Sequence, residues 1–364
     1  MSIRFKILDS CNDSRTGIIY TANGQINTPA FMPVGTLATV KSMLPESLIQ
    51  TGADIILGNT YHLMLRPGED IISNLGGLHK FMNWQKPILT DSGGFQVMSL
   101  AKLRKISDDG VEFRSHIDGR KYFLSPKKSI EIQHKLDSNI TMIFDECTPY
   151  PVNYEYAKKS MHLSLKWARE SKDNFIDRDG YGIFGIIQGS IFEDLRKESA
   201  TKLKEIEFDG YAIGGLAVGE GHDEMIKVLD FTIPHTPNHK PRYLMGVGKP
   251  IDIVASVKKG IDMFDCVLPT RSGRNGQAFI TGGTLNIKNN KYISDNSPLD
   301  KNCNCYTCKN YSKAYLNHLI RSKEILGSVL MTWHNISYYQ NLMRKLRKLI
   351  NNGTLYEYKN EELI

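Results

Sequence analysis

The stretch GIFGIIQG, residues 182–189, is apolar at almost every position and ends in an amide and a glycine. A strand with one face in water alternates apolar and polar residues. A nearly continuous apolar run is instead typical of a strand buried on both faces of a parallel sheet. The chain contains seven further short runs of this kind, so the sequence predicts eight buried strands; the other runs are residues 28–36, 53–60, 87–94, 141–147, 211–219, 242–248 and 262–269.

Helical patterns lie between these runs. Residues 125–136, SPKKSIEIQHKL, begin with a serine N-cap followed by proline at the first helical position. In residues 154–172, apolar positions recur at spacings of three and four, which marks one face of a helix. Eight strands that alternate with helices over about 250 residues predict an α/β fold, the (β/α)8 TIM barrel.

An open, doubly wound sheet is the alternative, because it also alternates strands with helices. Such a sheet usually has fewer strands and a phosphate-binding loop near its start. No G-x-G-x-x-G or Walker sequence follows the first predicted strand, so the barrel is favoured.

Three of the six cysteines, Cys303, Cys305 and Cys308, lie within six residues. The sequence shows no secretory signal, so we expect a cytoplasmic protein, in which such a cluster indicates a metal site rather than disulfides. His318 and His334 both follow the cysteines. We favour His334 as the fourth ligand, because it lies further along the chain and would bring a separate helix to the cluster. Three thiolates and one imidazole complete a tetrahedral shell, so we expect a structural zinc ion.

Two segments interrupt the alternation. Apolar residues alternate around Asp118 and Gly119, which predicts a β-hairpin inserted around residues 104–124, after the third strand. After Gln277 the pattern changes to the cysteine segment and a final helix, whose apolar stripe we expect to pack on the barrel or on a partner subunit. The expected domains are the barrel at 1–277, an inserted zinc-binding subdomain with C-terminal helices at 278–350, and a C-terminal tail at 351–364.

The bulk composition narrows the class of protein. The 364 residues are 41% hydrophobic, which is enough for a large core, and no apolar run approaches the ~18 residues of a membrane span. The net charge of +7 is compatible with a polyanionic partner but is weak evidence by itself. The positive charges gather in the C-terminal third, including MRKLRKLI at residues 343–350, which favours a nucleic acid more than the total does.

Polar residues stand at the ends of the predicted strands. Active sites of TIM barrels lie at the C-terminal ends of the strands, so these side chains should converge on one mouth. A single aspartate would more often be a helix cap or a loop acid, but three at the ends of different strands predict an active site. The residues at these ends are Asn59, Asp91, Asp145, Gln188, Gly215 and Asp265.

The neighbours of these residues suggest separate roles. Asp265 lies between Phe264 and Cys266 and is the candidate nucleophile, because a carboxylate can attack an anomeric carbon and hold a glycosyl intermediate. Asp145 is suited either to hydrogen bonding with a base or to proton transfer. Gln188 and the backbone of GGLAVG, residues 214–219, supply donors and acceptors for a planar heterocycle.

Two further features adjoin the predicted mouth. In DSGGFQ, residues 91–96, the glycines allow a ligand to approach the backbone closely, and Phe95 offers either a flat face or a core side chain. Arg271 and Arg274 follow Asp265 in a glycine-rich turn, where they are suited to bind an anion.

Taken together and in order, the segments LTDSGGFQVMSL, FDECTPYP, GIIQGS, GGLAVGE, YLMGVGKP, FDCVLPTR, RNGQAF and CNCYTC with its later histidine resemble the tRNA-guanine transglycosylases of the bacterial queuosine pathway. The resemblance covers essentially the whole chain. It implies exchange of the guanine at the wobble position of G-U-N anticodons for 7-aminomethyl-7-deazaguanine (preQ1) or guanine. The tRNAs concerned are those for aspartate, asparagine, histidine and tyrosine. It also implies a homodimer of barrels, each with a zinc subdomain.

The resemblance also assigns roles to individual residues. Asp265 matches the nucleophile that attacks C1′ of the wobble ribose, and Asp91 matches the general acid and base. The base-binding set is Asp145, Gln188, Gly215, Leu216 and Ser92, with Phe95 and Met245 on the two faces of the ring. The anticodon-binding segment is Arg271, Ser272, Gly273, Arg274 and Asn275, where SGRNG departs from the more common NARNG. The zinc ligands are Cys303, Cys305, Cys308 and His334.

Two other functions remain open at this point. A retaining glycoside hydrolase would also use a barrel and two carboxylates, but it does not explain the cysteine cluster or the arginines. A catalytically inactive RNA-binding paralogue would have lost active-site acids, whereas Asp91, Asp145 and Asp265 are all present.

Overall fold

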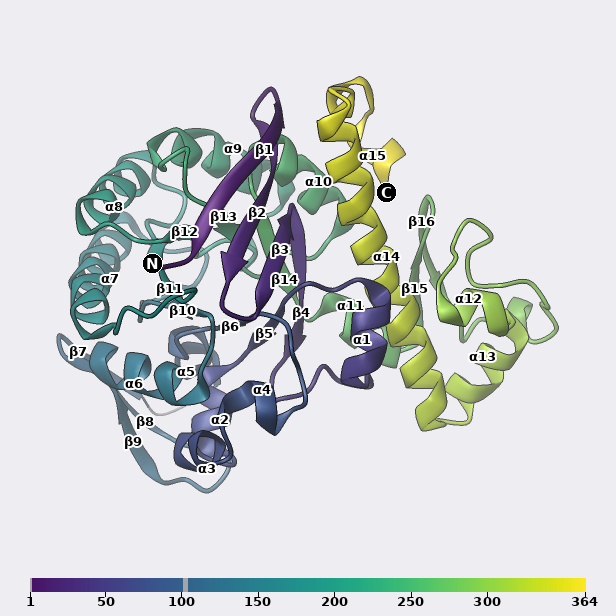
Figure 1. Ribbon diagram of the computed structural model, residues 1–364, viewed down its shortest axis with the longest axis horizontal. Helices are drawn as coiled ribbons and strands as arrows, with labels where there is room; N and C mark the ends of the chain where they lie inside the picture. Colours follow the sequence, from purple (N-terminus) through teal and green to yellow (C-terminus); the bar gives the residue numbers. More distant parts are fainter. Residues whose placement is uncertain (1, 101–103) are drawn as a thin grey trace.

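The eight predicted strands form a closed parallel barrel in the computed structural model, which describes residues 2–100 and 104–364 (Figure 1). Each barrel strand lies within or next to one of the eight apolar runs, so the (β/α)8 TIM barrel is confirmed. The strands are shorter than the runs because the ends of the runs form the loops at the mouth. They are β4 (Ala30–Gly35), β5 (Ile56–Gly58), β6 (Ile88–Thr90), β10 (Ile140–Met142), β11 (Gly182–Ile187), β12 (Gly210–Ile213), β13 (Arg242–Leu244) and β14 (Met263–Cys266).

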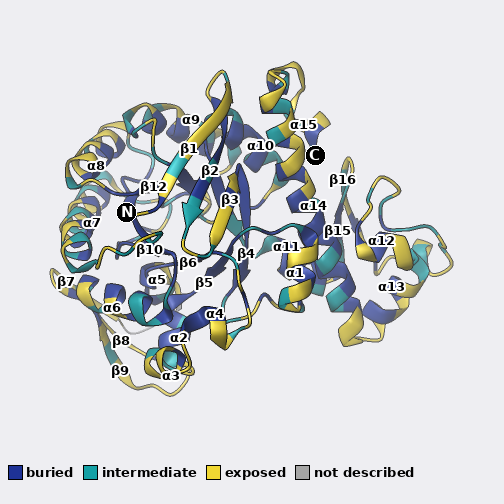
Figure 2. Ribbon diagram, in the orientation of Figure 1, coloured by how far each residue is buried: buried dark blue, intermediate teal, exposed yellow. Residues whose placement is uncertain are grey.

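The barrel closes where the last strand pairs with the first. Phe264 lies opposite Phe31 and Asp265 opposite Met32 in the β14–β4 pair. Figure 2 shows the barrel strands as buried, which agrees with their apolar composition on both faces.

Helices connect successive strands and surround the barrel (Figure 1). The serine N-cap predicted at residue 125 is confirmed, because Ser125 Oγ accepts a hydrogen bond from the Lys128 amide at 3.1 Å. The helices up to β14 are α1 (Pro45–Thr51), α2 (Thr60–Leu65), α3 (Glu69–Asn74), α4 (Gly77–Phe81), α5 (Gly94–Leu100), α6 (Pro126–Leu136), α7 (Tyr154–Asn174), α8 (Glu193–Ile206), α9 (His222–Thr232), the 3-10 helix η1 (Ile233–His235) and α10 (Pro250–Lys258).

An antiparallel sheet, which no apolar run in the sequence predicts, precedes the barrel. It consists of β1 (Arg4–Cys11), β2 (Ser14–Thr21) and β3 (Gly24–Thr28). The Ile3 amide donates to the Tyr181 carbonyl at 3.1 Å, directly before β11 begins. The sheet therefore covers the N-terminal end of the barrel, and its β1 strand is largely exposed (Figures 1 and 2).

The predicted hairpin after the third barrel strand is confirmed and has one more strand than expected. β8 (Gly110–Arg114) pairs with β9 (Lys121–Leu124), and β7 (Arg104–Ser107) adds to the other edge of β8. Gly119 in the connecting turn has a φ of +72°, a left-handed conformation that glycine adopts without strain.

The C-terminal part begins with a short helix and a hairpin and ends on one long helix. That helix, α14 (Ile325–Asn351), buries its apolar stripe on the barrel, where Tyr339 lies 4.6 Å from Phe31 between ring centroids. The other elements are α11 (Leu268–Arg274), β15 (Gln277–Ile280), β16 (Gly283–Asn286), η2 (Asn290–Tyr292), α12 (Tyr306–Asn310), α13 (Lys313–Arg321), η3 (Leu355–Glu357) and α15 (Asn360–Leu363).

The last residues pack onto the body of the protein. Leu355 and Leu363 are buried in the same apolar cluster as Val254 and Val257 of α10. Within the described part of the chain, no helix combines the length and the apolar character needed to cross a membrane.

Candidate active site

The structure brings the polar residues of the strand ends together at the C-terminal mouth of the barrel. Asp91, Asp145, Gln188 and Gly215 directly follow or lie just beyond β6, β10, β11 and β12, and Asp265 lies within β14. Hydrogen bonds connect several of them across strands. Within this cluster of three carboxylates, Asp91 and Asp145 are buried and Asp265 is partly buried.

Asp91 is held by the two residues that follow the preceding barrel strand, β5. The Thr60 amide donates to its Oδ1 at 2.8 Å, and the Asn59 side-chain amide donates to its Oδ2. Burial raises the pKa of Asp91 to about 6, although these hydrogen bonds oppose the rise, and the negative charge of Asp265 adds to it. A carboxyl group with this pKa can both donate and accept a proton near neutral pH.

Asp265 has one oxygen engaged and one available. Tyr243 Oη donates to Oδ1 at 2.6 Å and the Gly246 amide donates to the same oxygen at 2.8 Å. No described residue donates a hydrogen bond to Oδ2. Burial raises the pKa of Asp265, and the two donors oppose the rise by stabilising the ionised form.

Tyr243 belongs to the candidate site, but the position of strand ends does not predict it, because it lies inside the seventh barrel strand. Burial and the nearby Asp265 hold the pKa of Tyr243 well above its usual value, so its hydroxyl remains a donor. Its side chain therefore fixes the orientation of the Asp265 carboxylate.

Asp145 lies beside the amide of Gln188. Gln188 Nε2 donates to Oδ2 of Asp145 at 2.7 Å, and Ser92 Oγ donates to Oδ1 at 3.4 Å. Burial raises the pKa of Asp145 to about 6 against these two hydrogen bonds. A Cβ on Gly214 would lie 2.7 Å from Gln188 Nε2, so only glycine leaves room for this amide.

The two candidate stacking residues lie at different depths. Phe95, at the start of α5, is 50% exposed, so it is not a core side chain. Met245 is partly buried and packs against the barrel core, and Leu216 is buried.

The segment after Asp265 is helical rather than an open turn. In α11, Ser272 and Gly273 are buried, and a Cβ on Gly273 would lie 2.8 Å from the Thr332 amide of α14. Arg271 and Asn275 are exposed, and Arg274 is partly exposed. The helix thus packs one face on α14 and presents its charged side chains to solvent.

Cys303, Cys305, Cys308 and His334 form a compact cluster that could hold a metal ion. Their ligand atoms all lie within 4.8 Å of one another, and His334 Nδ1 lies 3.7, 3.5 and 3.3 Å from the three sulfurs. Bonds of about 2.3 Å to sulfur and 2.0–2.1 Å to nitrogen at tetrahedral angles place N and S about 3.6 Å apart. The spacing therefore fits one tetrahedral ion, and His318 is exposed outside the cluster.

The carbonyl of Phe279 lies 2.7 Å from His334 Nε2. An Nε2–H donor to this carbonyl leaves Nδ1 unprotonated and free to bind a metal, which is the usual arrangement around metal-binding histidines.

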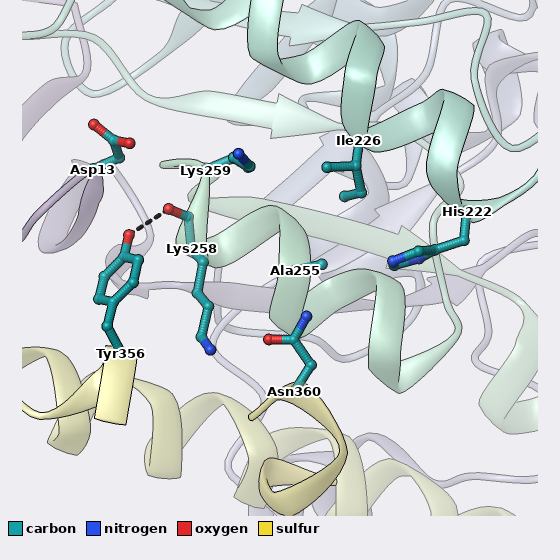
Figure 3. Close-up of a pocket in the computed structure, with 8 residues that line it drawn as sticks. All are labelled: Asp13, His222, Ile226, Ala255, Lys258, Lys259, Tyr356 and Asn360. Carbon is teal, nitrogen blue, oxygen red and sulfur yellow. Dashed lines mark hydrogen bonds between the residues drawn. The ribbon is translucent and has the colours of Figure 1, made fainter. Parts of the chain in front are cut away.

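A separate pocket of about 290 Å³ lies between α9, α10 and the C-terminal segment (Figure 3). Lys258 and Lys259 line it, but Lys258 donates to the Tyr358 carbonyl and Lys259 pairs with Asp230. None of its lining residues belongs to the strand ends, so this pocket is not part of the candidate site.

Comparisons with known proteins identify the family to which this chain belongs. The family model described as queuine tRNA-ribosyltransferase matches residues 9–363. The queuine tRNA-ribosyltransferases of Rickettsia bellii (strain OSU 85-389) and Rickettsia felis (strain ATCC VR-1525 / URRWXCal2) are each 63% identical over 354 residues, which cover 97% of this chain and 98% of each relative. That of Rickettsia massiliae (strain Mtu5) is 62% identical over the same shares. This chain therefore belongs to the queuine tRNA-ribosyltransferase family, a family of pentosyltransferases that act on tRNA.

Proposed function

We propose that this protein exchanges the guanine at the wobble position of G-U-N anticodons for preQ1, through a covalent intermediate between the tRNA and the enzyme. The observation that carries the proposal is the cluster of Asp91, Asp145 and Asp265 at one barrel mouth. Family membership supplies the reaction class, and the cluster supports the particular mechanism.

In the first half of the proposed reaction, Oδ2 of Asp265 attacks C1′ of the ribose. The new C1′–O bond forms as the C1′–N9 bond breaks, and guanine leaves with the electron pair and takes a proton from Asp91. Because no described residue donates to Oδ2, its lone pairs are available for attack. In the second half, Asp91 takes the N9 proton of the incoming base, whose nitrogen displaces Asp265 from C1′.

Base recognition follows from the donors and acceptors around Asp145. The edge of guanine presents the N1–H and N2–H donors next to the O6 acceptor. An ionised carboxylate only accepts hydrogen bonds, so Asp145 should face the two donors. Gln188 Nε2 and the Gly215 amide are the neighbouring donors and should face O6, while Phe95 and Met245 hold the faces of the ring and Leu216 and Ser92 complete the pocket.

The proposed RNA contacts come from the exposed side of α11. Arg271, Arg274 and Asn275 would bind the anticodon loop, and Ser272 and Gly273 would fix the helix on α14. The wobble base must leave its stack to reach the mouth, which costs less in a flexible loop than in a duplex. The four tRNAs with G-U-N anticodons, the homodimer and the cytoplasmic location stay predictions.

We also propose that the Cys3His cluster holds zinc. The thiolate-rich donor set suits zinc, and four protein ligands leave no position for water, so the ion would be structural. It would join the segment with Cys303, Cys305 and Cys308 to α14 through His334.

Asp265→Asn should abolish the covalent adduct between protein and tRNA, because an amide oxygen is a poor nucleophile and its C1′ ester cannot form. The measurement is a denaturing gel with labelled tRNA, in which the native protein gives a shifted band. Asp262→Asn would be a poor control because Asp262 is a buried structural acid, so exposed Asp223→Asn in α9 is the matched control. An undiminished adduct in Asp265→Asn would refute the assignment of the nucleophile.

The affinity for preQ1 should increase as the pH rises through about 6. Burial raises the pKa of Asp145 to about 6, and only the ionised form can accept both N–H groups of the base. Below this pH, protonation of Asp145 competes with binding of the base, and Kd should increase about tenfold for each unit by which the pH falls. Calorimetry between pH 4.5 and 8 measures the effect, with weaker and pH-independent binding expected for Asp145→Asn. A flat profile for the native protein would contradict this role.

Arg271→Ala should weaken tRNA binding and reduce the dependence of log Kd on log salt concentration by about one phosphate contact. The exposed guanidinium neutralises backbone charge, whereas the base pocket does not involve it. Filter binding at several salt concentrations checks this, with exposed Arg120→Ala in the β8–β9 turn as the control. An unchanged salt slope would count against the phosphate contact.

Purified protein should contain one zinc ion per chain, and Cys308→Ala should lose it and melt at a lower temperature. Three ligands bind more weakly than four, and the link between α12 and α14 would be lost. Elemental analysis and thermal melting measure both effects, and Cys11→Ser, outside the cluster, should change neither. Full zinc content in Cys308→Ala would overturn the ligand assignment.

A further inference from the structure

A buried arginine lies behind the proposed base pocket and forms no salt bridge in the described part of the chain. Arg196 projects from α8, is completely buried, and is among the largest fully buried side chains. Its Nη2 has no hydrogen-bond partner among the described residues. Burial lowers the pKa of Arg196 to about 10, which still leaves it charged at neutral pH.

An uncompensated buried charge is unfavourable for stability. An apolar side chain of similar size would remove the desolvation penalty, and a carboxylate partner would offset it. The energetic penalty therefore argues that Arg196 does more than fill space, so its contacts matter.

The guanidinium binds backbone carbonyls on both strands that carry the base-reading donors. Nη1 donates to the Ile187 carbonyl at 2.9 Å and to the Gly214 carbonyl at 2.8 Å, and Nε donates to the Ser190 carbonyl at 2.7 Å. Ile187 directly precedes Gln188, and Gly214 directly precedes Gly215. One side chain thus fixes the peptide groups on which both donors depend.

The geometry of the peptide bond links the position of the Gly214 carbonyl to the direction of the Gly215 N–H. The Gly214–Gly215 peptide is trans, so its C=O and N–H point in opposite directions. Because Arg196 holds the carbonyl on the α8 side, the Gly215 N–H is directed away from it, next to the Cys147 thiol. A Cβ on Gly215 would lie 2.6 Å from Gln188 Oε1 and 3.6 Å from Arg196 Nη2, so Gly215 lies close to both side chains.

We propose that Arg196 is a positioning residue for base specificity: by anchoring the carbonyls of Ile187 and Gly214, it directs the Gln188 and Gly215 donors at the O6 carbonyl of the purine. The inference rests on the proposed function, because it concerns how that same pocket distinguishes a 6-oxopurine from a purine without the oxygen.

The test compares guanine with 2-aminopurine, which keeps the 2-amino group but lacks O6 and the N1 proton. Because Asp145 is the same in every variant, a change in the comparison between variants reports on the O6 contacts. Binding of both bases to the full-length protein is measured by competition, and the ratio of their affinities is the readout. In Arg196→Met, this ratio should fall about tenfold, the effect of one well-directed hydrogen bond. Arg196→Lys should give an intermediate ratio, because one ammonium group cannot reach all three carbonyls.

Arg242→Met is the matched control. Arg242 is also buried, but it lies at the start of β13, at the other end of the barrel, where it bonds to Thr236 and Gly260. This variant should lose stability while it keeps the ratio of the native protein. A loss of stability in Arg196→Met with an unchanged ratio would mean that Arg196 only supports the fold, and the proposal would be overturned.

If Arg196→Met does not fold, Arg196→Lys decides the question, and an unchanged ratio in that variant overturns the proposal. Exchange of labelled guanine into tRNA by the native protein tests the underlying function separately. If the native protein exchanges guanine and the variants keep its ratio of affinities, only the role of Arg196 is refuted. Native protein that exchanges no guanine refutes the proposed function itself.

Discussion

Closure of the barrel between its first and last strands is the constraint on which the candidate site depends. The pairing of β14 with β4 sets the register in which Asp265 lies opposite Met32, and so brings Asp265 to the same mouth as Asp91. At the start of β14, Asp262 receives two hydrogen bonds from Arg15 of the N-terminal sheet, and both side chains are buried. Breaking such a buried pair typically costs about 3–5 kcal/mol, so the N-terminal sheet helps to fix the strand that carries Asp265.

Hydrogen bonds, rather than burial, distinguish the three carboxylates of the mouth. All three acids have raised pKa values, but their hydrogen bonds differ in number and direction. Donors on both oxygens of Asp91 and Asp145 fix the orientation of those groups, whereas both donors to Asp265 bind one oxygen and leave the other open. These differences are compatible with the three proposed roles of an acid, a base-binding group and a nucleophile within one mouth.

The sequence predicts the parts of this protein that follow a periodic or positional rule. The eight apolar runs predict the barrel, the strand ends predict the acids, and the cysteine spacing predicts the metal-binding cluster. The sheet of β1 to β3 was missed because none of its strands is a continuous apolar run: β1 is largely exposed, and the buried β2 contains serine, arginine and threonine. Tyr243 and Arg196 were missed because they act from inside a strand and from a helix. The positive charge of residues 343–350 is weak evidence for a nucleic-acid partner. Arg344 and Arg347 donate hydrogen bonds within the protein, to the carbonyls of Thr51 and Pro29.

The metal-binding cluster and the proposed RNA-binding helix are joined through two adjacent residues of α14. His334 belongs to the cluster and bonds to the Phe279 carbonyl, while the next residue, Asn335, donates to the carbonyls of Pro269 and Gln277 at the two ends of the α11 segment. A bound ion would fix the position of His334 and, through the same helical turn, the position of Asn335. Because α11 begins three residues after Asp265, a metal bound at the cluster would influence the approach of RNA to the proposed nucleophile without touching either.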